Sequence, residues 1–131
     1  MVEADAPVIR ILVVDDNAIS RELIRAAFDD DGFAVDEAAD GSEALARMRE
    51  TVPNVVLMDI QMPVMDGYTA LREIRRNPGW QHVPVVALTA YAMLEDRERA
   101  FAAGFNGYLA KPVNLTALRL QIEQLLKHRP T

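Results

Sequence analysis

The sequence predicts a single α/β domain built on a parallel β-sheet with helices on both faces. Three observations support this fold class. Five short apolar runs have the composition of strands buried on both faces. The runs alternate with segments whose apolar residues recur at helical spacing, and Gly or Pro residues mark many of the joins. The chain has 131 residues, a common size for one domain with its own core.

The strand assignments follow the apolar runs in chain order. The first run ends at the acid pair Asp15-Asp16, and the third ends at Asp59, shortly before Pro63 and Gly67. Strands that alternate with helices are joined by right-handed crossovers, so we expect them to run parallel. The expected strands are Ile9–Val14, Phe33–Ala38, Val55–Met58, Val83–Leu88 and Tyr108–Ala110.

The helix boundaries are marked by capping residues and by helix breakers. Asp40 precedes Glu43 by three residues, which is the spacing of a capping box, and Asp66 is a candidate cap for the third helix. Gly32 and Gly104 are candidate stops for the first and fourth helices. The expected helices are Ile19–Phe28, the segment from Asp40 to about Glu50, the segment from Asp66 to Asn77, Met93–Phe101 and Leu115–Leu126.

Composition excludes several functional classes. Fourteen Lys and Arg against twenty Asp and Glu give a net charge of −6, which disfavours direct DNA binding. The chain has no cysteine, which rules out disulfides and thiolate metal sites. Its acidic first residues do not resemble a signal peptide, and no apolar run reaches membrane-spanning length. We therefore expect a soluble, cytoplasmic protein without membrane insertion.

Five polar side chains are predicted to meet at one edge of the sheet. The carboxyl ends of parallel strands share an edge, and in open α/β sheets ligands bind there. If the strand order is 2-1-3-4-5, Asp15, Asp16 and Asp59 converge, and Thr89 and Lys111 end the last two strands at the same edge. The alternative is a purely structural Lys–Asp pair with Thr89 as a helix cap.

This group of side chains has the chemistry of a Mg²⁺ site. Clustered carboxylates repel one another unless a cation compensates them, and Mg²⁺ prefers carboxylate and phosphate oxygens. A carboxylate beside Mg²⁺ can attack phosphorus to form an acyl phosphate, with Lys111 and Thr89 stabilising charge on the phosphoryl oxygens.

The chain resembles the receiver domain of bacterial two-component response regulators. The similarity covers Ile9 to about Lys127, so we expect tails at residues 1–8 and 128–131 outside a domain at 9–127. It implies a flavodoxin-like (βα)5 fold with strand order 2-1-3-4-5. The motifs that carry it are Val13-Val14-Asp15-Asp16-Asn17, Leu57-Met58-Asp59-Ile60-Gln61-Met62-Pro63-Val64-Met65-Asp66-Gly67, Leu88-Thr89-Ala90 and Tyr108-Leu109-Ala110-Lys111-Pro112.

The resemblance also implies a role for each matching residue. Asp59 is then the phosphoacceptor, and Mg²⁺ is held by Asp16, by Asp59, by the backbone carbonyl of Gln61 and, through water, by Asp15. Lys111 would pair with Asp59, and a cis Lys111-Pro112 bond would aim the lysine into the site. Thr89 and Tyr108 would move as the switch pair. Gln61 and Tyr91 would tune the lifetime of the acyl phosphate.

The implied partners are a histidine kinase or histidine phosphotransfer protein as donor and a protein target downstream. The signal is expected on the surface of the fourth helix, fifth strand and fifth helix, by a shift between two pre-existing states. For each apolar candidate on that surface, ordinary packing is the favoured explanation: Ala92, Met93, Leu94, Tyr108 and Val113. The protein is expected to be a monomer or a phosphorylation-dependent dimer.

Three other interpretations of the chain are alternatives to a stand-alone receiver. The chain could be a receiver fragment of a hybrid sensor kinase or a larger regulator. A phosphohydrolase that forms an aspartyl phosphate needs a second Asp two residues after the nucleophile, where this chain has Gln61. A flavin-binding module needs a phosphate loop rich in Ser, Thr or Gly after the first strand, where Asp15 and Asp16 would repel phosphate.

Overall fold

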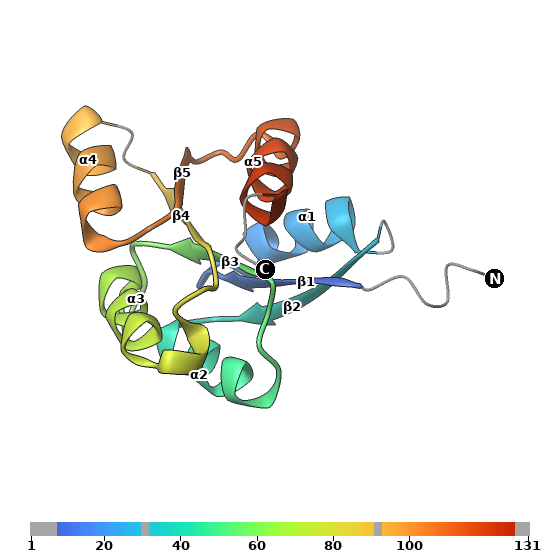
Figure 1. Ribbon diagram of the computed structural model, residues 1–131. Helices are drawn as coiled ribbons and strands as arrows, with labels where there is room; N and C mark the ends of the chain where they lie inside the picture. The colour runs from blue at the N-terminus through green and yellow to red at the C-terminus, as the bar shows by residue number, and fades with distance from the viewer. Residues whose placement is uncertain (1–7, 30–31, 91–92, 128–131) are drawn as a thin grey trace.

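A five-stranded parallel sheet of order β2-β1-β3-β4-β5 forms the centre of the protein, as expected (Figure 1). The computed structural model describes residues 8–29, 32–90 and 93–127. The strands are β1 (Ile9–Val14), β2 (Phe33–Ala38), β3 (Val55–Asp59), β4 (Val85–Thr89) and β5 (Gly107–Ala110).

The predicted start of β4 is wrong by two residues, whereas the ends of β3 and β4 and the start of β5 each differ from the prediction by one residue. β4 begins at Val85 and not at Val83, although Val83 is apolar and buried. The Val83 N–H donates to the Trp80 carbonyl, 3.0 Å away, in the turn formed by the short 3₁₀ helix η2 (Pro78–Trp80). Pro84 follows and has no N–H to donate. Neither residue can therefore donate a hydrogen bond to the β-ladder.

The helices begin and end close to the predicted positions. Asp40 and Asp66 cap α2 and α3 as expected, accepting hydrogen bonds from Glu43 N and Thr69 N at 2.8 Å each. Asn17, which was not predicted as a cap, accepts from Ser20 N at the start of α1. The helices are α1 (Ala18–Phe28), α2 (Gly41–Glu50), α3 (Gly67–Arg76), α4 (Leu94–Ala103) and α5 (Leu115–Lys127).

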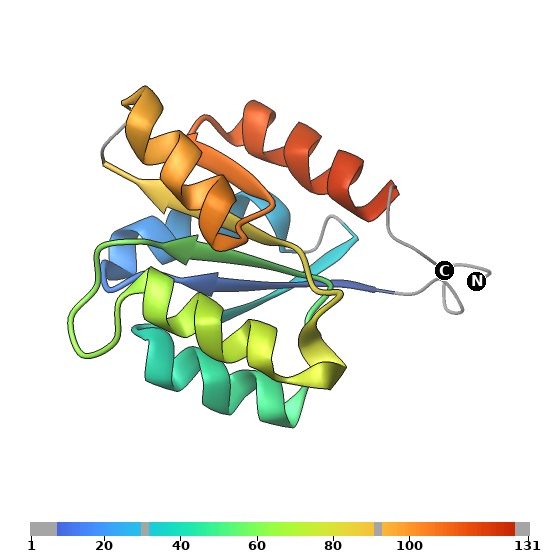
Figure 2. The same cartoon turned by 60° about the vertical axis from the view of Figure 1, so that its left-hand side comes forward.

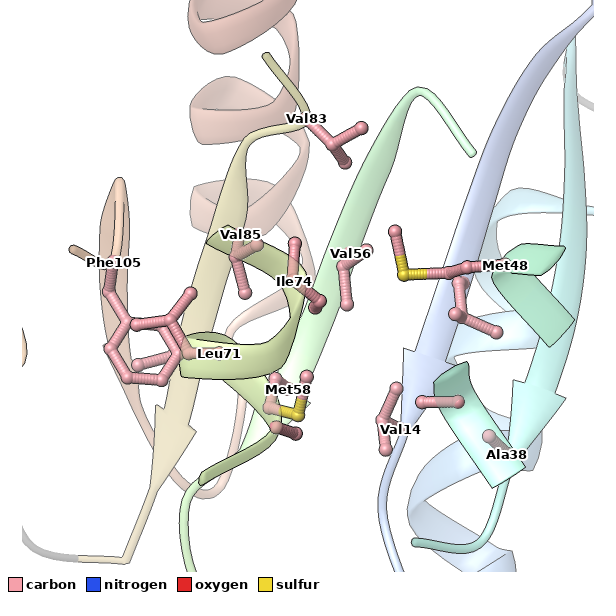
Figure 3. Packing of buried hydrophobic residues seen from close by; sticks show 14 of the residues in the cluster. Val14, Ala38, Met48, Val56, Met58, Leu71, Ile74, Val83, Val85 and Phe105 are labelled. Carbon is pink, nitrogen blue, oxygen red and sulfur yellow. The ribbon is translucent and has the colours of Figure 1, made fainter. Parts of the chain in front are cut away.

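The helices form two layers around the sheet (Figures 1 and 2). Side chains of α1 and α5 pack with one face of the sheet, in a cluster that includes Phe28 and Ile122. Side chains of α2, α3 and α4 pack with the other face. Figure 3 shows part of this second cluster, in which Met48 and Met58 fill space between helices and strands. Met62 and Met65, in the loop after β3, are partly buried and pack against the same cluster.

Strand register brings the predicted site residues to one edge. Val14 pairs with Met58, so Asp15 lies near the end of β3, where Asp59 is found. Thr89 pairs with Ala110, which places Lys111 just beyond the end of β4. All five strands are parallel, so these chain ends face the same side of the molecule.

Gly67 fixes the loop that leaves β3. Its N–H donates to the Ile60 carbonyl at 3.0 Å, which closes the loop back onto the end of the strand. A Cβ at position 67 would lie 2.6 Å from the Asp59 carbonyl oxygen and 2.8 Å from Ile60 Cα. The close approach of α3 to the end of β3 therefore requires glycine.

We predict that Gly67→Ala lowers the free energy of unfolding by about 1–3 kcal/mol, because the added methyl group overlaps rigid backbone. Urea denaturation would measure the change. Gly79→Ala is a matched control, since a Cβ there meets only the side-chain oxygen of Asn77, at 3.3 Å. Equal stability of Gly67→Ala and the wild type would contradict the requirement for glycine.

Candidate functional site

Three carboxylates meet at the C-terminal edge of the sheet, as the sequence predicts. Asp15 and Asp16 follow β1, and Asp59 is the last residue of β3. One oxygen from each carboxylate lies within 4.8 Å of the others. Asp15 and Asp59 are buried, with 0% and 3% of their surface exposed, whereas Asp16 is exposed. Two buried acids thus lie beside a third acid that is exposed to solvent.

Hydrogen bonds with three neighbours hold Asp15 in place. Its N–H donates to the Ala38 carbonyl at 3.1 Å, and its Oδ1 accepts from Asn17 N at 2.9 Å. The Asp15 carbonyl accepts from Arg21 Nη1 at 2.7 Å, and Arg21 Nε also donates to Glu37 at 2.8 Å. Sequence reasoning missed Arg21, because its partners lie at the end of β1 and on β2 and leave no local signal.

Lys111 places one ammonium group between two buried acids. Its Nζ lies 2.8 Å from Asp15 Oδ2 and 3.1 Å from Asp59 Oδ2. The Lys111 N–H donates to the Thr89 carbonyl at 2.7 Å, which fixes the residue beside β4. The Lys111–Pro112 peptide bond is cis, as the resemblance implied. The predicted convergence of Lys111 with the acids is therefore confirmed.

The pKa values of Asp59 and Lys111 are both shifted upward. Burial raises the pKa of Asp59, and the charge of Asp15 adds to this, while Lys111 and the Gln61 N–H oppose it; the pKa remains above its usual range. Burial alone would lower the pKa of Lys111, but Asp15 and Asp59 outweigh it and the pKa is raised. Lys111 thus stays charged, while burial and the neighbouring Asp15 outweigh the contribution of Lys111 at Asp59.

Thr89 and Gln61 lie next to Asp59. Gln61 N donates to Asp59 Oδ1 at 3.1 Å, and Thr89 Oγ1 donates to Gln61 Oε1 at 3.4 Å. Thr89 is buried, so its hydroxyl belongs to the interior of the site. Tyr108 is also buried and is part of the core cluster under α4. Burial raises the pKa of Tyr108, and a hydrogen bond with Thr89 opposes that rise.

The candidates for a signalling surface differ in exposure. Ordinary packing explains Tyr108, which is 9% exposed. It does not explain Met93 and Leu94, which are 62% and 67% exposed, so that interpretation is wrong for these two residues. The start of α4 turns them away from the core. Tyr91 and Ala92 lie outside the described residues.

The residues present fit a hard divalent cation. All three candidate ligands offer carboxylate oxygens, which Mg²⁺ prefers. Asp15 Oδ2 is buried, and apart from the contact with Lys111 Nζ it accepts no hydrogen bond from the described residues. A cation near the three acids would offset both the unmet acceptor and the excess negative charge.

Residues 11–123 match the family described as the response regulator receiver domain. The chain belongs to this family. Receiver domains are phosphoacceptor signalling modules rather than enzymes, and membership implies a histidine kinase as phosphodonor. None of the helices in the described ranges is both long and apolar enough to cross a membrane.

Two curated relatives show the receiver in different contexts. An uncharacterised 14.6 kDa protein of Leptolyngbya boryana is 40% identical over 92% of each chain. The response regulator PleD of Caulobacter vibrioides is 34% identical over 92% of this chain but only 26% of its own length. The chain thus spans nearly all of one relative and about a quarter of the other.

A solved structure extends the comparison to the metal. The receiver domain of a sensor histidine kinase from Pseudomonas aeruginosa superposes with a TM-score of 0.83 at 37% identity, over 92% of this chain and 99% of that one. That structure has a magnesium ion coordinated in its active-site cleft. The acidic triad of this chain could also bind a metal ion.

We predict that Asp59→Asn raises the melting temperature by about 2–5 °C in neutral buffer without Mg²⁺. The pKa of Asp59 is raised by folding, so its ionised form lowers stability once the pH exceeds the ordinary aspartate range. The difference from wild type should therefore shrink as the pH falls below that range.

Thermal unfolding followed by circular dichroism at several pH values would measure this effect. Glu123→Gln is the control, because it removes one negative charge from the exposed side of α5. An Asp59→Asn variant that is less stable than wild type at neutral pH, or a difference that does not depend on pH, would contradict the electrostatic interpretation.

Proposed function

We propose that the chain accepts a phosphoryl group on Asp59 from a phosphohistidine donor, with Mg²⁺, and passes the signal to a protein partner. The observation that carries this proposal is the placement of Asp59, a buried carboxylate within 4.8 Å of two other acids and in contact with Lys111. Membership of the receiver family supports the same chemistry.

In the proposed transfer, a carboxylate oxygen of Asp59 attacks phosphorus. A P–O bond forms, the P–N bond to the donor imidazole breaks, and its electron pair returns to the imidazole nitrogen. Asp59 must be ionised to attack, and its raised pKa lies on the side that strengthens a carboxylate as a nucleophile. Lys111 Nζ, 3.1 Å from Asp59 Oδ2, is placed to contact the transferred group.

Asp15, Asp16, Asp59 and the Gln61 carbonyl would hold Mg²⁺, with Asp15 acting through water. The ion supplies positive charge that offsets the acids and the phosphoryl oxygens. The Gln61 N–H already donates to Asp59 Oδ1, which holds the start of the loop against the acid. Gln61 and Tyr91, which lie two residues after Asp59 and Thr89 in the sequence, are the positions proposed to tune the lifetime of the acyl phosphate.

Thr89 and Tyr108 form the proposed switch pair. Thr89 Oγ1 would exchange its long contact with Gln61, 3.4 Å, for a phosphoryl oxygen. Tyr108 is already buried beside the core, so phosphorylation would change its hydrogen bonding more than its exposure. The doubly charged phosphoryl group biases the equilibrium because it interacts differently with the two arrangements.

The output surface is proposed to lie on α4, β5 and α5. Met93 and Leu94 are exposed apolar residues near its edge, which suits contact with a protein partner. The phosphodonor is a histidine kinase or a histidine phosphotransfer protein, and the chain acts in the cytoplasm without binding DNA itself. Phosphorylation acts on a monomer or drives a dimer.

The domain is proposed to cover residues 9–127, with residues 1–8 and 128–131 as tails. A stand-alone receiver agrees with the similarity to the 14.6 kDa relative, which this chain nearly covers. A receiver fragment of a hybrid kinase or larger regulator is the second candidate, because PleD matches over only 26% of its length.

We predict a gain of one phosphoryl group in intact mass when the protein is incubated with acetyl phosphate and Mg²⁺. The gain should be lost with Asp59→Asn and without Mg²⁺, because both the acceptor carboxylate and the compensating cation are needed. Asp66→Asn is the matched control in the same loop, since Asn also caps helices and the variant keeps Asp59.

Labelling of Asp59→Asn at the wild-type level would contradict the assignment of the acceptor. No labelling of the wild type by acetyl phosphate or by a phosphorylated histidine phosphotransfer domain would contradict the proposed function itself.

A further inference from the structure

Helix α4 is weakly held over most of its length. Ala100 is its one buried residue among the described side chains. Met93 occupies the N-cap position but makes no side-chain capping bond, and Leu94 and Phe101 are 67% and 41% exposed. The first turn therefore gains little from packing or from capping.

The C-terminal end of α4 is held much more firmly. Gly104 ends the helix in the left-handed region, with φ +114°, and its N–H donates to the Phe101 carbonyl at 3.1 Å. Phe105 follows, is 3% exposed and packs edge-to-face on Tyr68 of α3, with ring centroids 5.6 Å apart. Moving this end would expose a buried aromatic ring.

Arg75, near the end of α3, donates hydrogen bonds to the segment that follows the C-terminal end of α4. Its Nη2 donates to the Gly104 carbonyl at 3.1 Å and to Asn106 Oδ1 at 2.6 Å. Its Nη1 donates to the Val83 carbonyl at 2.8 Å and to the Gln81 carbonyl at 3.3 Å. One guanidinium therefore joins α3, the approach to β4 and the connection from α4 to β5.

Asn106 extends this attachment into the sheet. Its Oδ1 also accepts from Val85 N at 2.8 Å, and its N–H donates to the Val85 carbonyl at 2.7 Å. Arg75 thus bonds to a side chain that is itself bonded to the first residue of β4. The end of α4 is tied to the rigid sheet and not only to another helix.

The two ends of α4 lie at opposite ends of the sheet. In Figure 2 the N-terminal end of α4 lies toward the same side as the loop between β3 and α3, and its C-terminal end lies toward the far side. Thr89, the switch candidate, is the last residue of β4, and the chain then leads into the N-terminal end of α4. The weakly held end is thus the one nearer to the acidic site.

We infer that Arg75 is a positioning residue that fixes the C-terminal end of α4 as a pivot, so that changes at Asp59 displace mainly the first half of the helix. The first half can move at the cost of few buried contacts. Movement of the second half would break the bonds of Arg75 and uncover Phe105. The link to Asp59 rests on the proposed function, whereas the pivot does not.

The test is hydrogen exchange, followed by mass spectrometry, in the unphosphorylated protein. Arg75→Met should raise exchange at residues 98–106 at least tenfold and leave α5 unchanged. Arg75→Lys keeps the positive charge but lacks the planar guanidinium group with its several N–H donors. Its exchange at these residues should therefore lie between that of wild type and that of Arg75→Met. Arg72→Met, on the exposed side of the same helix, is the matched control and should leave exchange as in wild type.

Unchanged exchange at residues 98–106 in Arg75→Met would overturn the pivot. An equal rise in every helix would also overturn it, because the residue would then contribute only to global stability. Both outcomes are independent of any phosphoryl chemistry.

A second measurement adds beryllofluoride, an analogue of the phosphoryl group, with Mg²⁺. Bound beryllofluoride is detected separately by ¹⁹F NMR. In the wild type, the change in exchange on binding should be confined to residues 94–98 of α4, and in Arg75→Met it should extend to residue 104. Bound analogue with a uniform response along α4 in the wild type would overturn the inference while leaving the proposed function intact. Absence of a bound signal would overturn the proposed function and, with it, the link between Asp59 and α4.

Discussion

The contact of one ammonium group with two buried carboxylates is the interaction on which the site depends. Lys111 Nζ lies within about 3 Å of Asp15 and Asp59. The pKa of Asp59 is nevertheless raised, because burial disfavours its charged form and the charge of Asp15 adds to that rise. In the proposed function, a divalent cation would offset the negative charge of the three acids, and a phosphoryl group on Asp59 would change that charge again. Ligand binding and conformation would then be coupled through the same few atoms.

The parallel sheet makes this arrangement possible. Five strand ends face one edge, so residues 15, 59, 89 and 111, far apart in the sequence, meet there without any long loop. Rigid backbone holds each one: Gly67 closes the loop after Asp59, Arg21 bonds the carbonyl of Asp15, and the Lys111 N–H donates to Thr89. At the opposite end of the sheet, Arg75 fastens α4. The site is therefore supported on several sides, while the helix beside it is held at one end.

Much of this could be predicted from the sequence because the signals are local. The strands were predicted from apolar runs, two of which end in acids. The starts of two helices were predicted from Asp40, three residues before Glu43, and from the candidate cap Asp66. Contacts between distant segments left no such signal. Arg21 and Arg75 look like ordinary helix charges, and the start of β4 depends on a turn at Trp80. Val64 has φ 70°, a conformation that a β-branched residue rarely adopts and that no sequence rule would assign to it. Strand order and residue roles came from the family resemblance, and the order is confirmed by the structure.

The measurement that tests the central claim most directly is chemical mapping of the acyl phosphate. Sodium borodeuteride reduces an aspartyl phosphate to a deuterated homoserine, which peptide sequencing by mass spectrometry assigns to one position. After incubation with acetyl phosphate, the account predicts homoserine at position 59 alone, and only when Mg²⁺ is present. Homoserine at position 15 or 16, or modification of position 59 without a divalent cation, would contradict the view that Asp59 is the acceptor in a site completed by a metal ion.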